Sequence, residues 1–186
     1  RLAIVTNGGG IGIMATDTLI EEGGKLASID EAVMEKLNTV LPPTWSHCNP
    51  VDIIGDAPAK RYSDTLGTLL GNRSQDGILV INCPVAVADG TEAAQAVVDT
   101  LKGKKHQVLT SWLGDGSAQD ARDLFAASRI PTYETPNKAV RAFMHMVRYR
   151  KNQELLMETP ASTPEQFKVD EKAARAVIDA AISEGR

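Results

Sequence analysis

A glycine-rich segment directly after a short apolar run is the first candidate for chemistry. The apolar run Leu2–Thr6 is typical of a buried strand, and the NGGGIG sequence of residues 7–12 leads from it into a segment with helical character. Glycine leaves room for close approach, and the free amides at a helix N-terminus carry about half a positive charge. We therefore predict a phosphate-binding loop formed by Asn7, Gly8, Gly9, Gly10, Ile11 and Gly12. The alternative is that the glycines only form a tight strand-to-helix turn.

Further polar groups come from the long connection over residues 46–56 and from the end of the strand predicted at 77–83, near the edge where parallel sheets bind ligands. We predict that the loop is supported by Asn49, Asp52, Asn82, Cys83 and Pro84. Asn49 before Pro50 also suits a turn, and Cys83 is more plausible as an inert core thiol than as a nucleophile, whereas Asp52 has no such structural alternative. The nearby Asp56 suits a helix cap.

Several familiar sites are disfavoured by spacing. A dinucleotide fingerprint would need a third glycine where Ile13 stands, and Asp30, which could bind a ribose, is equally explained as a helix N-cap. No Walker A sequence is present, and the histidines His47, His106 and His145 are too scattered for a metal site. We therefore expect no metal.

The elements that must position these groups alternate regularly along the chain. Apolar runs predict strands at residues 2–6, 26–29, 77–83, 107–112 and 130–133. Helical periodicity predicts helices from the glycine loop to Gly23, and over residues 30–41, 56–70, 91–101 and 118–128, with Ser117 and Asp120 as a capping box. A last core helix begins at Pro136, with its buried stripe formed by Val140, Phe143, Met144 and Val147.

This alternation predicts an α/β fold, a three-layer, flavodoxin-like (Rossmann-like) five-stranded parallel sheet in the order 2-1-3-4-5. We expect this domain to cover residues 1–150. Residues 151–186 are predicted to be a linker and a C-terminal helix, with a loop over 158–164 and the helix over 165–184.

Composition excludes some functions. The chain has 186 residues, of which 42% are hydrophobic and 24% charged, with a formal net charge of −4. This balance argues against a general nucleic-acid surface, and the apolar runs are too short to span a membrane. The two cysteines fit a reducing compartment, so we expect a cytoplasmic protein. The basic cluster of Lys138, Arg141, Arg148, Arg150 and Lys151 serves either solvation or docking.

Three segments carry a family resemblance: LAIVTNGGGIGIMATD at residues 2–17, NPVDIIGD at 49–56 and YETPNKAV at 133–140. Together they resemble the NDP-forming (ADP-forming) acyl-CoA synthetase family, which includes succinyl-CoA synthetase, across nearly the whole chain. The chain looks like the second flavodoxin-like CoA-ligase domain, equivalent to the C-terminal domain of the succinyl-CoA synthetase beta subunit. The same domain occurs in bacterial protein lysine acetyltransferases fused to a synthetase-like region, and the context of Trp45-Ser46 and Ile53-Ile54 favours that branch.

The resemblance implies the reaction acyl-CoA + ADP + phosphate ⇌ acid + ATP + CoA, which proceeds through an acyl phosphate and a phosphohistidine. It implies that the helix starting near Gly10 to Gly12 cradles the phosphoryl group of a phosphohistidine supplied by another domain, so that no catalytic residue lies in this chain. The expected partners are the CoA-binding, phosphohistidine and ATP-grasp domains of the same polypeptide. Residues 173–186 would approach the ATP-grasp region, and association with further copies of the chain is left open.

These implications predict a domain that is inactive alone. The chain begins directly on a strand and closes on a helical run, which also indicates a piece of something longer. We expect it to bind no cofactor by itself, whereas the intact protein would use CoA and ADP or ATP with Mg. Two alternatives remain: a catalytically silent acyl-CoA-sensing or assembly module of a protein lysine acetyltransferase, and, less favoured, an independent nucleotide-binding enzyme.

Overall fold

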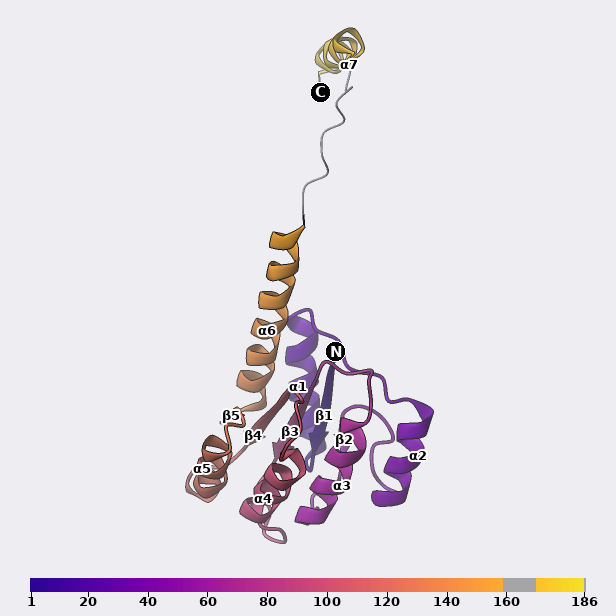
Figure 1. The fold of residues 1–186 in the computed structure, drawn as a ribbon. Helices are drawn as coiled ribbons and strands as arrows, with labels where there is room; N and C mark the ends of the chain where they lie inside the picture. The colour runs from indigo at the N-terminus through magenta and orange to yellow at the C-terminus, as the bar shows by residue number, and fades with distance from the viewer. Residues whose placement is uncertain (159–169, 186) are drawn as a thin grey trace. The chain divides into compact units, whose positions relative to one another are not determined.

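The computed structural model describes residues 1–158 and 170–185. The chain divides into two compact units, Arg1–Arg150 and Lys151–Arg186. The first unit contains the whole sheet, and helix α6, Pro136–Met157, continues from the first unit into the second (Figure 1). In the second unit, α7 spans Glu171–Ser183 and is capped by Asp170, whose side chain accepts a hydrogen bond from the amide of Ala173.

Five parallel strands form one sheet in the order β2-β1-β3-β4-β5, which confirms the predicted order. The strands are β1 (Leu2–Thr6), β2 (Val51–Asp52), β3 (Gly77–Asn82), β4 (Val108–Trp112) and β5 (Thr132–Tyr133). Every residue of β1 and β3 is buried, as a sheet covered on both faces requires. In the register of the central strands, Val5 lies opposite both Val51 and Val80.

Two hydrophobic clusters fill the space between the sheet and its helices. One face is covered by α2 (Glu31–Val40), α3 (Ala59–Leu70), α4 (Gly90–Leu101) and α5 (Gln119–Ala127), whose core side chains include Leu37, Leu66, Val97 and Phe125 (Figure 1). The other face is covered by α1 (Gly9–Glu21) and α6, through side chains such as Leu19 and Phe143. The alternating strand residues supply both clusters, because successive side chains point to opposite faces.

The second strand is the main correction to the sequence prediction. Residues 26–29 do not form a strand of the sheet, and Leu26 makes only an isolated bridge to Leu2. The edge of β1 is occupied there by the side chain of Asn49, which accepts a hydrogen bond from the Ile4 amide (3.0 Å) and donates to the carbonyls of Leu2 (3.0 Å) and Ala27 (2.9 Å). The backbone of residues 25–27 therefore pairs with β1 only at Leu2, and from there to Ile4 a side-chain amide takes the place of a partner strand; β2 begins only at Val51.

Three smaller predictions about caps and core positions were also wrong. The predicted Ser117 and Asp120 capping box is absent, because a short 3₁₀ turn, Gly116–Ala118, precedes α5 and its N-cap residue Ala118 has no capping side chain. Asp56 does not cap α3; its carboxylate accepts a hydrogen bond from Arg61 at 2.6 Å. Val147 is 38% exposed and lies outside the buried stripe of α6. The predicted loop at 158–164 and the start of its following helix lie, from residue 159 to 169, outside the described residues.

Candidate functional site at the N-terminus of α1

The glycine segment forms the start of α1 rather than a separate loop. Gly8 is the extended N-cap residue, and the helix begins at Gly9, slightly earlier than the predicted start near Gly10 to Gly12. The amides of Ile11 and Gly12 both donate to the Gly8 carbonyl at 3.1 Å, and the Gly8 amide donates to Thr6 Oγ1 at 3.0 Å. In the described ranges the amides of Gly9 and Gly10 have no acceptor, as expected for the first turn of a helix.

Close packing explains why most of these positions need glycine. A Cβ atom on residue 8 would lie 2.7 Å from Cys83 Sγ, and one on residue 12 would lie 2.9 Å from Thr6 Cγ2. A Cβ on residue 10 would meet nothing within 4 Å, and Gly10 is exposed. The first turn of α1 is therefore pressed against the ends of the neighbouring strands at residues 8 and 12, while Gly10 opens to solvent.

Asp52, the last residue of β2, lies beside this first turn. Its Oδ2 atom is 2.7 Å from the position of a Cβ on Gly9. Its Oδ1 atom accepts a hydrogen bond from the Ile54 amide at 2.9 Å, and its own amide donates to Ser46 Oγ at 2.9 Å, so the carboxylate is held in place. A carboxylate at a helix N-terminus interacts favourably with the helix dipole and disfavours a second anion nearby. No turn or helix cap accounted for Asp52 in the sequence, and the structure places its carboxylate beside Gly9.

Asn7 links the ends of β1 and β3 and does not point a free amide into the site. Its Oδ1 atom accepts a hydrogen bond from the Cys83 amide at 2.7 Å, and its Nδ2 atom donates to the Cys83 carbonyl at 2.9 Å. The side chain is 3% exposed. Both polar atoms are thus used to extend the pairing of two parallel strands beyond Thr6, which fixes the place where α1 starts.

Asn82 belongs to a buried hydrogen-bond network behind the carboxyl ends of the strands. Its Nδ2 atom donates to the Tyr62 hydroxyl at 2.9 Å, and that hydroxyl is 3.4 Å from the Ile81 carbonyl, to which it donates. Burial raises the pKa of Tyr62 far above its usual range, so the phenol stays protonated. Beside this network, Trp112 Nε1 donates to the Gly90 carbonyl at 2.9 Å. These groups hold the start of α4 against the sheet.

Cys83 is a protonated packing residue at neutral pH. The side chain is half-buried against Gly8. Burial, and secondarily the charge of Asp52, raises the pKa of the Cys83 thiol. Because the thiolate is the nucleophilic form, this environment favours the inert interpretation. Pro84 is exposed and lies toward the next loop, with its Cγ atom 3.7 Å from the position of a Cβ on Gly114.

Gly8, Gly9, Asp52 and Cys83 therefore lie together at the start of α1, and we call this group of residues the α1 corner. Asn49 makes its hydrogen bonds further back along β1. The N-terminus of α4 provides an informative contrast, because Asp89 caps it and accepts hydrogen bonds from Thr91 (2.7 Å) and Glu92 (3.2 Å). The start of α1 has neither a capping side chain nor an acidic residue in its own first turn. The arrangement offers two amide donors beside one fixed carboxylate acceptor.

The described ranges contain neither a metal-ion cluster nor a membrane-spanning helix. No group of three His, Cys, Asp or Glu side chains there could hold a metal ion. Among the same residues, no helix combines the length and the apolar character that a membrane crossing requires.

Comparison with known proteins gives consistent matches. A family model described as the Ligase-CoA domain matches residues 2–156. The ADP-forming acetate–CoA ligase I of Archaeoglobus fulgidus is 37% identical over 151 residues, which are 81% of this chain and 21% of that protein. The alpha subunit of the ADP-forming acetate–CoA ligase I of Pyrococcus furiosus is 34% identical over 153 residues, 81% of this chain and 33% of that subunit.

A solved structure agrees with these relatives. The dinucleotide-forming acetyl-coenzyme A synthetase 1 of Ca. Korarchaeum cryptofilum, in complex with phosphate and ADP, matches with a TM-score of 0.81 and 30% sequence identity. The match covers 88% of this chain and 36% of that chain. The present chain thus spans about a fifth to a third of the length of the curated relatives named above.

Proposed function

Because the chain belongs to the Ligase-CoA domain family of NDP-forming acyl-CoA synthetases, we propose that it is a non-autonomous domain of a multidomain synthetase that seats a phosphoryl group on the N-terminus of α1. The parent protein would interconvert acyl-CoA, ADP and phosphate with acid, ATP and CoA. The phosphoryl group would arrive on a phosphohistidine that belongs to another domain. This chain would contribute electrostatic stabilisation and no covalent chemistry.

The main observation that supports this proposal is that the backbone amides of Gly9 and Gly10 have no acceptor in the described ranges. They are donors fixed in place by the helix and by the packing of Gly8 and Gly12, so they need no rearrangement when a phosphoryl group arrives. Preorganised donors of this kind are usually the largest contribution to stabilising developing charge. The open space around Gly10 leaves a path for the group to approach from solvent.

Asp52 would distinguish a phosphohistidine from a free phosphate. Its charge repels a bare dianion near Gly9, which weakens the binding of free phosphate. An imidazole that carries a phosphoryl group on one nitrogen bears an N–H on the other when protonated, and a carboxylate is a strong acceptor for it. Asp52 is held by Ile54 through Oδ1, which leaves Oδ2 to accept such a donor beside Gly9.

The remaining parts of the reaction are assigned to other domains. Binding of CoA, and of ADP or ATP with Mg, would take place in the regions of the parent protein that this chain does not cover. The proposed partners are therefore the CoA-binding, phosphohistidine and ATP-grasp domains. The Pyrococcus furiosus relative is named as an alpha subunit, which supports partners on a separate chain as well as in the same one.

An NMR titration of the chain with inorganic phosphate tests the proposed phosphoryl-binding site at the N-terminus of α1, which we call the phosphoryl seat. The amides of Gly9 and Gly10 should shift in a saturable way, and those of Thr91 and Glu92 at the capped start of α4 serve as the internal control because Asp89 already occupies them. If the two sets of amides shift equally, or if neither shifts even in the Asp52→Asn variant, which lacks the repelling charge, the seat is refuted. That result would favour the sensing or assembly role.

A further inference from the structure

A cavity of about 570 Å³ lies at the opposite edge of the sheet from the α1 corner. It is bounded by the C-terminal ends of α4 and α5 and by the residues that lead into β4 and β5, whereas the glycines follow the carboxyl end of β1. The cavity thus lies at the amino ends of the parallel strands, whereas the start of α1 lies at their carboxyl ends. The cavity is therefore independent of the proposed phosphoryl seat and of every residue that forms it.

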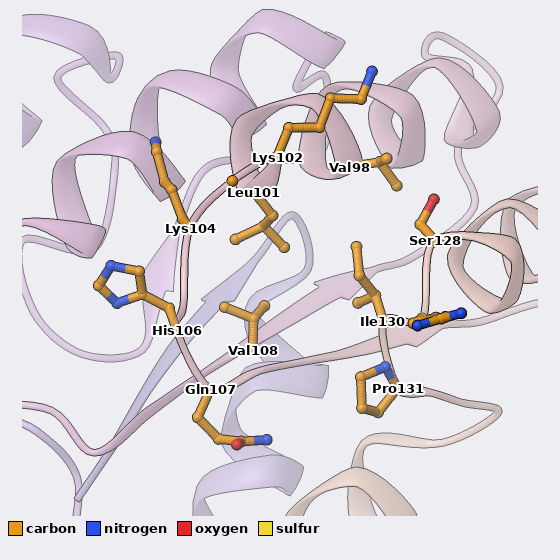
Figure 2. A pocket seen from close by; sticks show the side chains of 12 residues that line it. Val98, Leu101, Lys102, Lys104, His106, Gln107, Val108, Ser128, Ile130 and Pro131 are labelled. Carbon is orange, nitrogen blue, oxygen red and sulfur yellow. The ribbon is translucent and has the colours of Figure 1, made fainter.

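The floor of the cavity is apolar. Val98 and Val108 are buried, and Leu101 and Ile130 are partly buried against the larger hydrophobic cluster. Figure 2 shows the side chains of Leu101, Val108 and Ile130 facing one another across the cavity, with Ser128 beside them on the α5 side. Such a floor excludes water from a flat or apolar group placed on it.

The rim of the cavity is cationic, and no acidic residue lines it. Lys102, Lys104, His106 and Arg129 lie along it, and Figure 2 shows Lys104 and His106 on the segment that connects α4 to β4. Lys102 is paired with Asp99 at 2.7 Å. Lys104 and Arg129 have no carboxylate partner in the described part of the chain, so their charges are available to a ligand.

We propose that this cavity binds a phosphate ester with a flat or apolar body of about nucleotide size. The volume lies in the range of small-molecule sites, roughly 300–1,000 Å³, and is far larger than a phosphate ion needs. Two rim cations that have no carboxylate partner in the described part of the chain match a group of more than one negative charge. The apolar floor provides the place for the body, as hydrophobic linings do in most small-molecule sites.

The alternative explanation for the rim is that cations after a helix C-terminus merely complement the helix dipole. That explanation accounts for charge at the ends of α4 and α5, and it predicts no preference for a ligand that combines charge with an apolar body. The experiment therefore separates the two contributions with matched probes.

The test is an NMR titration of the full chain with ADP, pyrophosphate and adenosine. ADP combines a charged diphosphate with a flat nucleoside body. Pyrophosphate has the charge without the body, and adenosine has the body without the charge. We expect ADP to shift the amides of Gly103, Ser128 and Ile130 with a Kd at least about tenfold lower than that of either other probe. A Kd for pyrophosphate equal to that of ADP, or no saturable shift with ADP, would overturn the proposal.

Substitutions complete the test. Lys104→Gln and Arg129→Asn remove the two unpaired charges, and asparagine tolerates the positive φ of 57° at residue 129. Each should raise the Kd for ADP at least about threefold. Lys105→Gln is the matched control, because Lys105 is an exposed neighbour that does not line the cavity. An equal loss in the Lys105 variant would show nonspecific charge attraction. The amides of Gly9 and Gly10 report separately on the α1 seat.

Discussion

The carboxylate of Asp52 restricts which amino acid can occupy position 9. Its Oδ2 atom lies 2.7 Å from the position of a Cβ on Gly9, a distance that real Cβ atoms do not adopt. The last residue of β2 and the first residue of α1 are thus in direct contact, although their numbers in the sequence differ by 43. This contact couples the geometry of the helix N-terminus to a fixed negative charge.

Replacing Gly9 with alanine should therefore destabilise the domain. The added methyl group would force Asp52 away from its hydrogen bond with Ile54, and overpacking of this kind costs about 1–3 kcal/mol. Gly10→Ala is the control, because a Cβ there meets nothing within 4 Å, and alanine is the better helix former by up to about 1 kcal/mol. Urea denaturation should show a loss for the first variant and no loss for the second; equal effects would contradict the assigned contact.

Asn7→Ala should have a larger effect on stability than its position at a loop suggests. The variant removes both hydrogen bonds to Cys83 and leaves its backbone groups without their partners, at a cost of about 2–4 kcal/mol. Asn38→Ala is a matched comparison, since the exposed Asn38 accepts one hydrogen bond, from Trp45 Nε1, and its loss should cost only about 1 kcal/mol. The free energies of unfolding of the two variants, measured in urea, decide whether Asn7 is the clamp between β1 and β3.

Asp52→Asn should make the Cys83 thiol more reactive. Burial and the charge of Asp52 both raise the pKa of Cys83, so removing the charge lowers this pKa toward its usual value while burial still keeps it raised. More thiolate is then present at mildly alkaline pH. The alkylation rate against pH, measured in a Cys48→Ser background, should shift to lower pH. Asp56→Asn is the control, because the Asp56 carboxylate is paired with Arg61, and an equal shift there would contradict the assignment.

Acid should weaken the attachment of α1 to α6. Glu22 pairs with Arg148 and, at 3.4 Å, with Arg141, and the hydrogen bond from Arg148 is the main cause that lowers the pKa of Glu22. A lowered folded-state pKa gives stability that is present above the unfolded value of about 4.3 and is lost as the pH falls through the folded value. Glu22→Gln should reduce this loss of unfolding free energy on acidification. Glu21→Gln, at an exposed neighbour without an ion pair in the described residues, should leave the pH dependence as it is.

Much of the fold could be predicted because its signals are local. The continuous apolar runs of β1 and β3 and the three- and four-residue spacing of Val33 and Leu37 in α2 depend only on neighbours in the sequence. The second strand could not be predicted in this way. β2 has only two residues, and its place is decided by the side chain of Asn49, which occupies the edge of β1 from a distant position in the chain.

The candidate site divides in the same manner. The glycine spacing correctly indicated a strand followed by a helix N-terminus, and the end of β3 brings Cys83 beside it, whereas Asp52 arrives on β2, the strand that the sequence pattern did not indicate. The roles of Asn7 and Asn82 depend on partners that only the folded chain supplies, namely the backbone of Cys83 and the hydroxyl of Tyr62. The apolar and cationic cavity at the opposite edge escaped prediction, because its lining comes from two separate segments, residues 98–108 and 128–131.

The role of the α1 N-terminus is tested by the binding of phosphohistidine, compared with histidine, to the chain and to its Asp52→Asn variant. We expect phosphohistidine to shift the amides of Gly9 and Gly10 and histidine to leave them unshifted. We expect the Asp52→Asn variant to bind free phosphate more tightly and to lose the preference for phosphohistidine over free phosphate. Unshifted Gly9 and Gly10 amides at saturating phosphohistidine, or an unchanged preference in the variant, would contradict this role.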